Sequence, residues 1–211
     1  MTMKLYCFGE SGNSYKAALT LELAKVDWEP VFVDFFKGEA RTPEYRETVN
    51  EMGEAPVLVD GDMRISQSGA IQQYIIDKTG SPLAGRPEDK YEVMRWCFWD
   101  NHKMSSQAGV IRFLLNFLPE DKRPLSAIAF LQGRLDAALD VLDKRLAGRD
   151  FLVGDFLTLA DISCSAYLFY PEPFGFARGD WAHIDAWLER LENYPGWKHP
   201  YDLMPRAWPA S

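Results

Sequence analysis

The stretch from Gly53 to Ile71 constrains the fold of this chain more than any other. Pro56 opens a short apolar run, Asp60-Gly61-Asp62 has the composition of a hairpin turn, and a second short strand leads into a helical pattern at Gln67-Ser68. Because proline lacks the N–H that a sheet ladder needs, it belongs at the first residue of a strand or on an edge. The stretch therefore predicts a β-hairpin followed by a helix.

Two features of this stretch suit a small peptide as ligand. Ala55, the residue before the proline, keeps its backbone N–H and C=O available at the start of the strand. Gln67 and Ser68 fall at a helix start, where unpaired N–H groups and the positive end of the helix dipole attract a carboxylate. One pocket could thus offer a peptide-like edge at Ala55 and a carboxylate anchor at Ser68. The alternative is a plain hairpin followed by a capped helix.

Ala55-Pro56-Val57-Leu58 followed by Gln67-Ser68-Gly69-Ala70-Ile71 resembles the glutathione-binding half of the glutathione S-transferase superfamily. The resemblance implies that the Ala55–Pro56 bond is cis and that the Ala55 backbone pairs with the cysteinyl part of glutathione. It also implies that Gln67 and Ser68 hold the γ-glutamyl end. The implied fold is an α/β thioredoxin-like N-terminal domain, of order β-α-β-α-β-β-α, followed by an all-α C-terminal helical domain.

The N-terminal residues fit this order. Residues 3–8 are predicted as a buried strand, residues 9–13 as a turn and residues 14–26 as a helix. Thioredoxin-like proteins carry Cys-x-x-Cys at the start of this helix, where the present chain has Ser11-Gly12-Asn13-Ser14. Both thiols are replaced by hydroxyls, so disulfide exchange through that pair is impossible.

Ser11 is the leading candidate for the catalytic residue. A serine hydroxyl can donate a hydrogen bond to a thiolate that belongs to the ligand, and a helix N-terminus also favours a thiolate over a thiol of pKa about 8.5. The serine-type transferases activate glutathione in this way. We also expect Asn13, two residues further on, to bind glutathione. The alternative role for Ser11 is an N-cap, for which Asn13 and Ser14 are equally suited. Tyr6 and Cys7 are rivals, because other classes place a tyrosine or a cysteine near this position.

Between these segments, residues 28–36 are predicted as a second strand and residues 44–49 as a short helix. This order suggests parallel and then antiparallel pairing on one sheet. Lys37 lies in the loop that often contacts the glycyl carboxylate in the family, although a solvated surface lysine is as good an interpretation. The family frequently has Asn-Pro before the hairpin, where this chain has Asn50-Glu51, and the departure leaves the shape of the loop open.

Length and composition agree with two modest domains. The chain has 211 residues, 47% of them hydrophobic, and its character changes at the Gly- and Pro-containing residues 80–87, where we place the domain boundary. We predict a first domain over residues 1–80, to which the resemblance assigns glutathione binding, a linker over 81–87 and a helical domain over 88–211. The net charge of −8 argues against nucleic acids and anionic membranes as partners. No run approaches the roughly 18 apolar residues of a spanning helix, and no signal peptide is apparent. Three cysteines and three histidines without ligand spacing predict no metal site and a reducing, cytoplasmic location.

The second half is predicted to be helical. A long helix runs from Pro87 towards Pro119, with a bend near Ser105-Ser106 or Gly109, and further helices cover residues 128–146 and 183–193. Thr158 and Asp161 form a capping box whose role is folding, not chemistry. The polar cluster Asp100-Asn101-His102-Lys103 either contacts the electrophile or glutathione, or is a solvated helix face. The side chains that could reach a second-substrate pocket are Trp96, Trp99, Asn101, His102, Lys103, Arg112, Tyr167 and Tyr170.

The resemblance implies a cytoplasmic, homodimeric glutathione transferase that takes part in detoxification by activating the glutathione thiol for attack on a small apolar electrophile. A glutathione-dependent reductase, dehalogenase or isomerase on the same site is the alternative among enzymes. A non-enzymatic glutathione-binding or stress-response protein is the alternative from another class. The site residues are Ser11 as the catalytic residue and Asn13, Lys37, Ala55, Pro56, Gln67 and Ser68 for glutathione.

Overall fold

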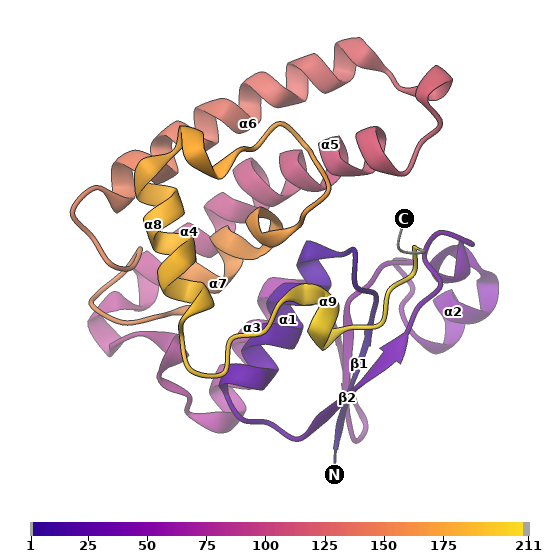
Figure 1. The fold of residues 1–211 in the computed structure, drawn as a ribbon. Coiled ribbons are helices and arrows are strands. Elements are labelled where there is room, and N and C mark those ends of the chain that lie inside the picture. The colour runs from indigo at the N-terminus through magenta and orange to yellow at the C-terminus, as the bar shows by residue number, and fades with distance from the viewer. Residues whose placement is uncertain (1, 209–211) are drawn as a thin grey trace. The chain divides into compact units, whose positions relative to one another are not determined.

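The computed structural model describes residues 2–208, which form two compact units (Figure 1). The first unit contains residues 2–84 together with residues 195–208, and the second contains residues 85–194. The sequence analysis assigned all residues from 88 onwards to the helical domain. Instead, the final segment packs with the first unit, where the Tyr15 hydroxyl donates to the Lys198 carbonyl at 2.8 Å. This segment also contains a short helix, α9 (Pro200–Leu203), that the sequence did not predict.

The first unit is built on a four-stranded sheet of order β2-β1-β3-β4. β1 (Met3–Cys7) pairs in parallel with β2 (Trp28–Phe32) and antiparallel with β3 (Val57–Asp60), which pairs antiparallel with β4 (Met63–Ser66). The predicted parallel and then antiparallel pairing is confirmed. Pro30 lies in β2, which is an edge strand. Proline lacks a backbone N–H, and an edge strand tolerates this because one of its sides has no neighbouring strand.

β2 ends earlier than the predicted residue 36. The Val33 N–H still donates to the Cys7 carbonyl at 3.0 Å, but the Phe35 N–H turns back to the Val33 carbonyl at 2.8 Å. The Asp34 carbonyl then accepts from Glu39 at 3.1 Å, which closes the loop. The backbone donors after Val33 are thus used within the loop, and the strand cannot continue.

Three α-helices surround this sheet. α1 (Gly12–Leu23) and α3 (Ser68–Thr79) lie side by side, while α2 (Pro43–Thr48) lies apart from them (Figure 1). A buried hydrogen bond from Gln72 Nε2 to Thr20 Oγ1, at 3.1 Å, joins α1 and α3. α1 begins two residues before the predicted start, because Ser11 is its N-cap.

The second unit is helical, as predicted. The expected bend in the long helix is a π-helical turn at Asn101–Ser105. The Pro87–Asp89 turn before this helix is 3₁₀ rather than α. The α-helices of the unit are α4 (Lys90–Asp100), α5 (Ser106–Asn116), α6 (Leu125–Leu146), α7 (Leu159–Ser165) and α8 (Ala182–Glu192). The other 3₁₀ turns within residues 2–208 are Glu39–Arg41, Pro82–Ala84, Glu120–Lys122, Ala166–Phe169 and Arg178–Asp180.

Asp161 organises the core of the second unit. Its carboxylate accepts the Thr158 N–H at 2.9 Å, which confirms the predicted capping box. It also accepts the Leu152 N–H at 2.9 Å and the Trp187 indole N–H at 3.0 Å. Burial raises the pKa of Asp161 to about 6. The side chain therefore joins three segments of the unit and serves its fold.

Candidate functional site

Ser11 caps α1 and still has a hydrogen to donate. Its Oγ accepts the Ser14 N–H at 3.1 Å, so the N-cap role holds. Because the oxygen serves as acceptor in that bond, the hydroxyl hydrogen remains available, and no acceptor for it occurs among residues 2–208. Ser11 is 8% exposed, whereas Ser14 is fully buried. Of the two serines that replace the thioredoxin-type cysteines, Ser11 is the one that keeps some exposed surface.

The two rivals of Ser11 point elsewhere. Cys7 is fully buried in β1, and burial raises the pKa of its thiol to about 12. Tyr6 packs against a small buried cluster made by Val33, Ala40 and Tyr45. Neither side chain is placed as a donor to a ligand thiolate.

Asn13 and Ser68 come together at the starts of two helices. Ser68 is buried as the first residue of α3, and its hydroxyl lies 3.5 Å from Asn13 Oδ1 in the first turn of α1. Neither first turn contains an acidic residue. No acidic residue of either first turn therefore offsets the positive end of its helix dipole, which favours an anionic ligand here.

The Ala55–Pro56 bond is cis, as predicted. Outside the strands, no backbone hydrogen bond of Ala55 is found among the described residues. The carbonyl of the preceding Glu54 accepts two bonds, from Asn50 Nδ2 at 2.9 Å and from the Tyr45 hydroxyl at 3.1 Å. These two side chains hold the backbone in front of Ala55, whose own N–H and C=O are the groups predicted to bind the ligand.

Asn50 fixes the shape of the loop that the sequence left open at Asn50-Glu51. Its Oδ1 accepts the Met52 N–H at 3.1 Å while its amide donates to Glu54, so one side chain holds both ends of the loop. The sequence analysis did not select Tyr45, Asn50 or Glu54 as site residues. An asparagine three residues before a glycine is a turn signal in the sequence, and it could have identified Asn50. Gly53 indeed adopts φ +69°. No such signal marks the bond from Tyr45 to the Glu54 carbonyl.

Gln67 has an unusual backbone. Its φ is +70°, a region that residues other than glycine rarely adopt. Its side chain does not cap α3 but donates from Nε2 to the Glu54 carboxylate at 3.0 Å. Strain of this kind persists where surrounding contacts impose it and concentrates at ligand sites.

Lys37 stands apart from these residues. Its side chain is 86% exposed and pairs with Asp34 at 2.9 Å. No hydrogen bond or ion pair joins Lys37 to another predicted site residue among residues 2–208. Its role towards a glycyl carboxylate stays a prediction.

The polar cluster in the second unit differs from a simple solvated face. Asp100 is 1% exposed and accepts the Ser105 hydroxyl at 2.9 Å across the π turn, while Asn101 and His102 are exposed. Arg112 is also buried, and its guanidinium pairs with Glu172 at 2.6 Å. Asp100 and Arg112 are therefore engaged in the fold of this unit.

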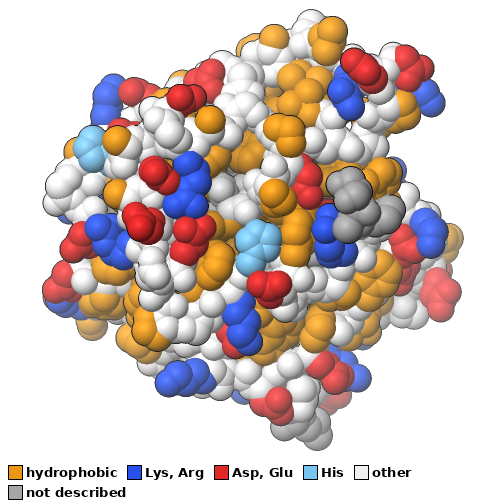
Figure 2. All heavy atoms as spheres, in the orientation of Figure 1, with side chains coloured by type: hydrophobic (Ala, Val, Ile, Leu, Met, Phe, Trp, Pro, Cys, Tyr) orange, Lys and Arg blue, Asp and Glu red, His pale blue; other side chains and the backbone are white. Residues whose placement is uncertain are grey.

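No group of three or more histidine, cysteine or carboxylate side chains within residues 2–208 could hold a metal ion. No helix in that range has both the length and the apolar character needed to cross a membrane. On the face shown in Figure 2, acidic and basic side chains are interspersed.

Comparison with known proteins gives a consistent picture. The family model for the N-terminal domain of glutathione S-transferases matches residues 1–77, and the model for the C-terminal domain matches residues 111–195. Glutathione S-transferase F10 of Arabidopsis thaliana is 33% identical over 200 residues, which cover 88% of this chain and 90% of the relative. The disulfide-bond oxidoreductase YfcG of Escherichia coli is 26% identical over 214 residues, 97% of this chain and 90% of the relative.

A solved structure from the same family is also similar to this chain. A glutathione S-transferase-I bound with the ligand lactoylglutathione is similar with a TM-score of 0.83 and 28% identity, and the match covers 97% of this chain and all of that one.

Proposed function

Because this chain belongs to the glutathione S-transferase family, we propose that its N-terminal unit binds glutathione and that Ser11 holds the glutathione sulfur as a thiolate. The chain is a glutathione transferase, and glutathione is its co-substrate. The observation that carries the proposal is the Ser11 hydroxyl, which accepts a backbone N–H and keeps its hydrogen for the ligand, on a residue that is 8% exposed.

The chemistry of the first step is an ionisation. The bound thiol loses its proton to water, and the resulting thiolate accepts the Ser11 hydrogen bond beside the positive end of α1. A hydrogen bond to the charged form lowers the pKa of a group, so a larger fraction of the sulfur is nucleophilic at neutral pH. Ser11 forms no covalent bond in this scheme.

The rest of glutathione is held by the residues around Ser11. The γ-glutamyl carboxylate lies at the start of α3, where it accepts from the Ser68 hydroxyl. The Glu54 carboxylate orients Gln67 towards the same end. The backbone of Ala55 pairs with the cysteinyl segment, Pro56 begins the strand behind it, Asn13 supports Ser68 and Lys37 supplies charge for the glycyl carboxylate.

The second step is attack on a small apolar electrophile in a detoxifying conjugation. The sulfur lone pair forms a carbon–sulfur bond. A leaving group such as halide departs with its electron pair, or, in an addition, water supplies a proton to the acceptor. The proposed enzyme is cytoplasmic and homodimeric. The exposed Tyr91 and Phe98 on α4 and Phe130 on α6 support a subunit interface on the second unit.

Glutathione-dependent disulfide reduction is a second candidate, favoured by the similarity to the oxidoreductase of Escherichia coli. It uses the same thiolate, which attacks a disulfide, releases one thiolate and forms a mixed disulfide that a second glutathione resolves. No protein cysteine is required.

The test begins with calorimetry of glutathione binding, followed by turnover of an aryl halide, an enone and a low-molecular-weight disulfide. We expect micromolar to millimolar binding and turnover of the aryl halide or the enone. Turnover of the disulfide alone would select the reductase. Binding without any turnover would leave a glutathione-binding protein, and an absence of binding would overturn the proposal. Light scattering reports the dimer.

A further inference from the structure

The C-terminal segment, residues 205–208, is docked onto the loop that leads to Ser11. The Gly9 N–H donates to the Pro205 carbonyl at 2.7 Å. The N–H groups of Ala207 and Trp208 donate to the two carboxylate oxygens of Glu10 at 2.9 and 3.0 Å. Residues nearly two hundred positions apart are thereby joined by three backbone donors.

Glu10 is the centre of this attachment. Its side chain is completely buried, although a buried carboxylate is tolerated only where donors replace water. Arg206 Nε lies 3.5 Å from the same carboxylate and adds a positive charge. In the site described above, Glu10 has no role towards glutathione. Its burial is explained by the segment that it holds.

Gly9 permits the close approach. A Cβ atom at this position would lie 3.2 Å from the Pro205 carbonyl oxygen and 3.2 Å from Tyr201 Cδ1. The guanidinium of Arg206 stacks over the Tyr201 ring at 4.0 Å from its centroid. The segment is therefore fitted to the loop on both sides of the Glu10 contact.

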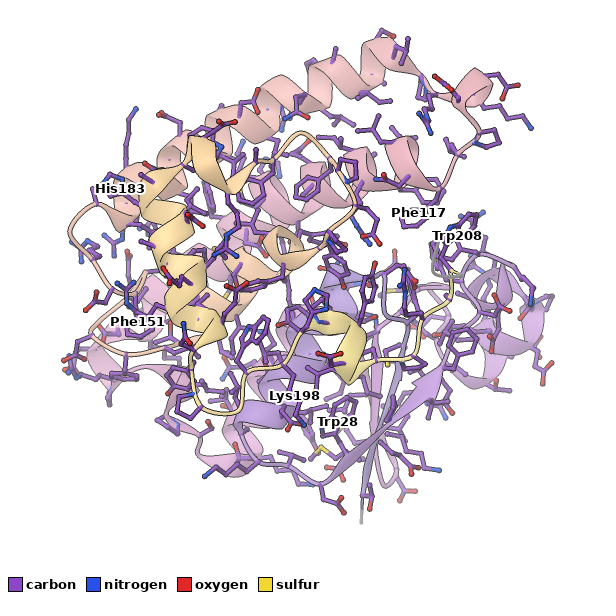
Figure 3. All side chains as sticks on the ribbon, viewed as in Figure 1. Trp28, Phe117, Phe151, His183, Lys198 and Trp208 are labelled. Atoms are coloured by element: carbon purple, nitrogen blue, oxygen red, sulfur yellow. The ribbon has the colours of Figure 1, made fainter. Side chains whose placement is uncertain are left out.

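The docked segment ends in an aromatic cluster beside the Ser11 turn. The Trp208 ring lies 5.0 Å from the Phe36 ring, and Phe8 stacks on Phe35 at 4.6 Å. The Phe8 carbonyl accepts the Ser11 N–H at 3.2 Å, which ties the cluster to the catalytic turn. Trp208, labelled in Figure 3, is 39% exposed. Part of its ring surface is thus open to a ligand.

We propose that Trp208 determines specificity for electrophiles that carry an aromatic ring, and that Glu10 is the positioning residue that places it. The inference rests on the proposed function. An aromatic group attached to the glutathione sulfur would pack against the Trp208 ring, since aromatic pairs gain energy beyond their buried area. A small aliphatic group on the sulfur would not reach that ring.

The test compares binding of S-benzylglutathione and S-methylglutathione by calorimetry. Trp208→Ala is expected to lower the affinity for S-benzylglutathione about 3- to 10-fold and to change the affinity for S-methylglutathione less than about 2-fold. Trp208→Phe should retain most of the discrimination. In Glu10→Gln, one backbone N–H faces an amide instead of a carboxylate oxygen, and we expect the same selective loss.

Two controls make the test specific. Glu29→Gln changes an exposed, ion-paired carboxylate of the same unit and should match the wild type. The double variant of Glu10 and Trp208 should be no worse than Trp208→Ala alone, because both changes act through one ring. In hydrogen exchange, the amides of residues 207 and 208 should be protected in the wild type and exposed in Glu10→Gln.

The outcomes distinguish a failure of the roles of Trp208 and Glu10 from a failure of the proposed function. Equal losses for both ligands, or no loss in Trp208→Ala, would overturn the specificity role while leaving glutathione binding intact. Unprotected amides at residues 207 and 208 in the wild type would overturn the docking by Glu10. Failure of the wild type to bind S-methylglutathione would instead overturn the proposed function.

Discussion

The hydroxyl of Ser68 lies 3.5 Å from the side-chain oxygen of Asn13, so the first turns of α3 and α1 meet through one long hydrogen bond. A bond at this distance is weak and is readily exchanged for one to a ligand carboxylate. The N-cap of α3 is Gln67 and not Ser68. The hydroxyl of Ser68 is therefore not needed to start the helix.

Ser68→Ala should weaken glutathione binding by about 1.5–3 kcal/mol, because a charge-assisted hydrogen bond to the ligand is lost. The melting temperature should stay nearly constant. Ser66→Ala, two residues away on β4, is the matched control and should bind normally. Calorimetry measures the effect, and unchanged affinity in Ser68→Ala would remove Ser68 from the site.

Gln67→Gly should separate stability from binding. Glycine adopts a φ of +70° freely, so the folded state is relieved of strain worth about 1–3 kcal/mol, less about 0.5–1 kcal/mol for the greater freedom of the unfolded chain. The bond to Glu54 is lost at the same time. We expect the free energy of unfolding to rise or hold while glutathione affinity falls. Loss of stability in urea denaturation would contradict this account.

Thr158→Ala should cost about 0.5–2 kcal/mol of stability through the lost cap. Asp161→Ala should cost more, because the Leu152 N–H and the Trp187 indole N–H also lose their buried acceptor. Activity per folded molecule should hardly change in either variant. A large fall in kcat at an unchanged melting temperature would give this capping box a role in chemistry.

Cys7 should be chemically silent. With a pKa raised to about 12, its thiol stays protonated at every pH used for assay, and burial excludes reagents. Cys7→Ala should therefore keep kcat/KM within about threefold, at a cost of roughly 1–2 kcal/mol in stability from the small cavity. Mass spectrometry after iodoacetamide treatment should find Cys7 unmodified in the native protein. Rapid alkylation, or a dead variant, would restore Cys7 as a rival of Ser11.

Local sequence patterns predicted the hairpin, the start of α3 and the Thr158–Asp161 box, because each depends on residues close together in the chain. The cis proline was implied by the family resemblance, and α1 begins two residues before its predicted start. They could not show that Tyr45 and Asn50 hold the Glu54 carbonyl, since that convergence requires the folded loop. The attachment of residues 205–208 to Glu10 joins opposite ends of the sequence and has no local signal. The early end of β2 reflects the loop hydrogen bonds after Val33, which outweigh a favourable strand pattern.

The ultraviolet absorbance of the thiolate in the glutathione complex, measured against pH, tests the role of Ser11 most directly. In the wild type, the pKa of the bound thiol should lie below the value of about 8.5 for a free thiol, and Ser11→Ala should raise it again, each unit corresponding to about 1.4 kcal/mol. Ser14→Ala, which removes a fully buried hydroxyl of the same turn, should titrate like the wild type. Turnover of Ser11→Ala should fall at neutral pH and recover in part at alkaline pH, with glutathione affinity nearly intact. Identical titration curves for the wild type and Ser11→Ala would contradict the account and leave Ser11 as a helix cap alone.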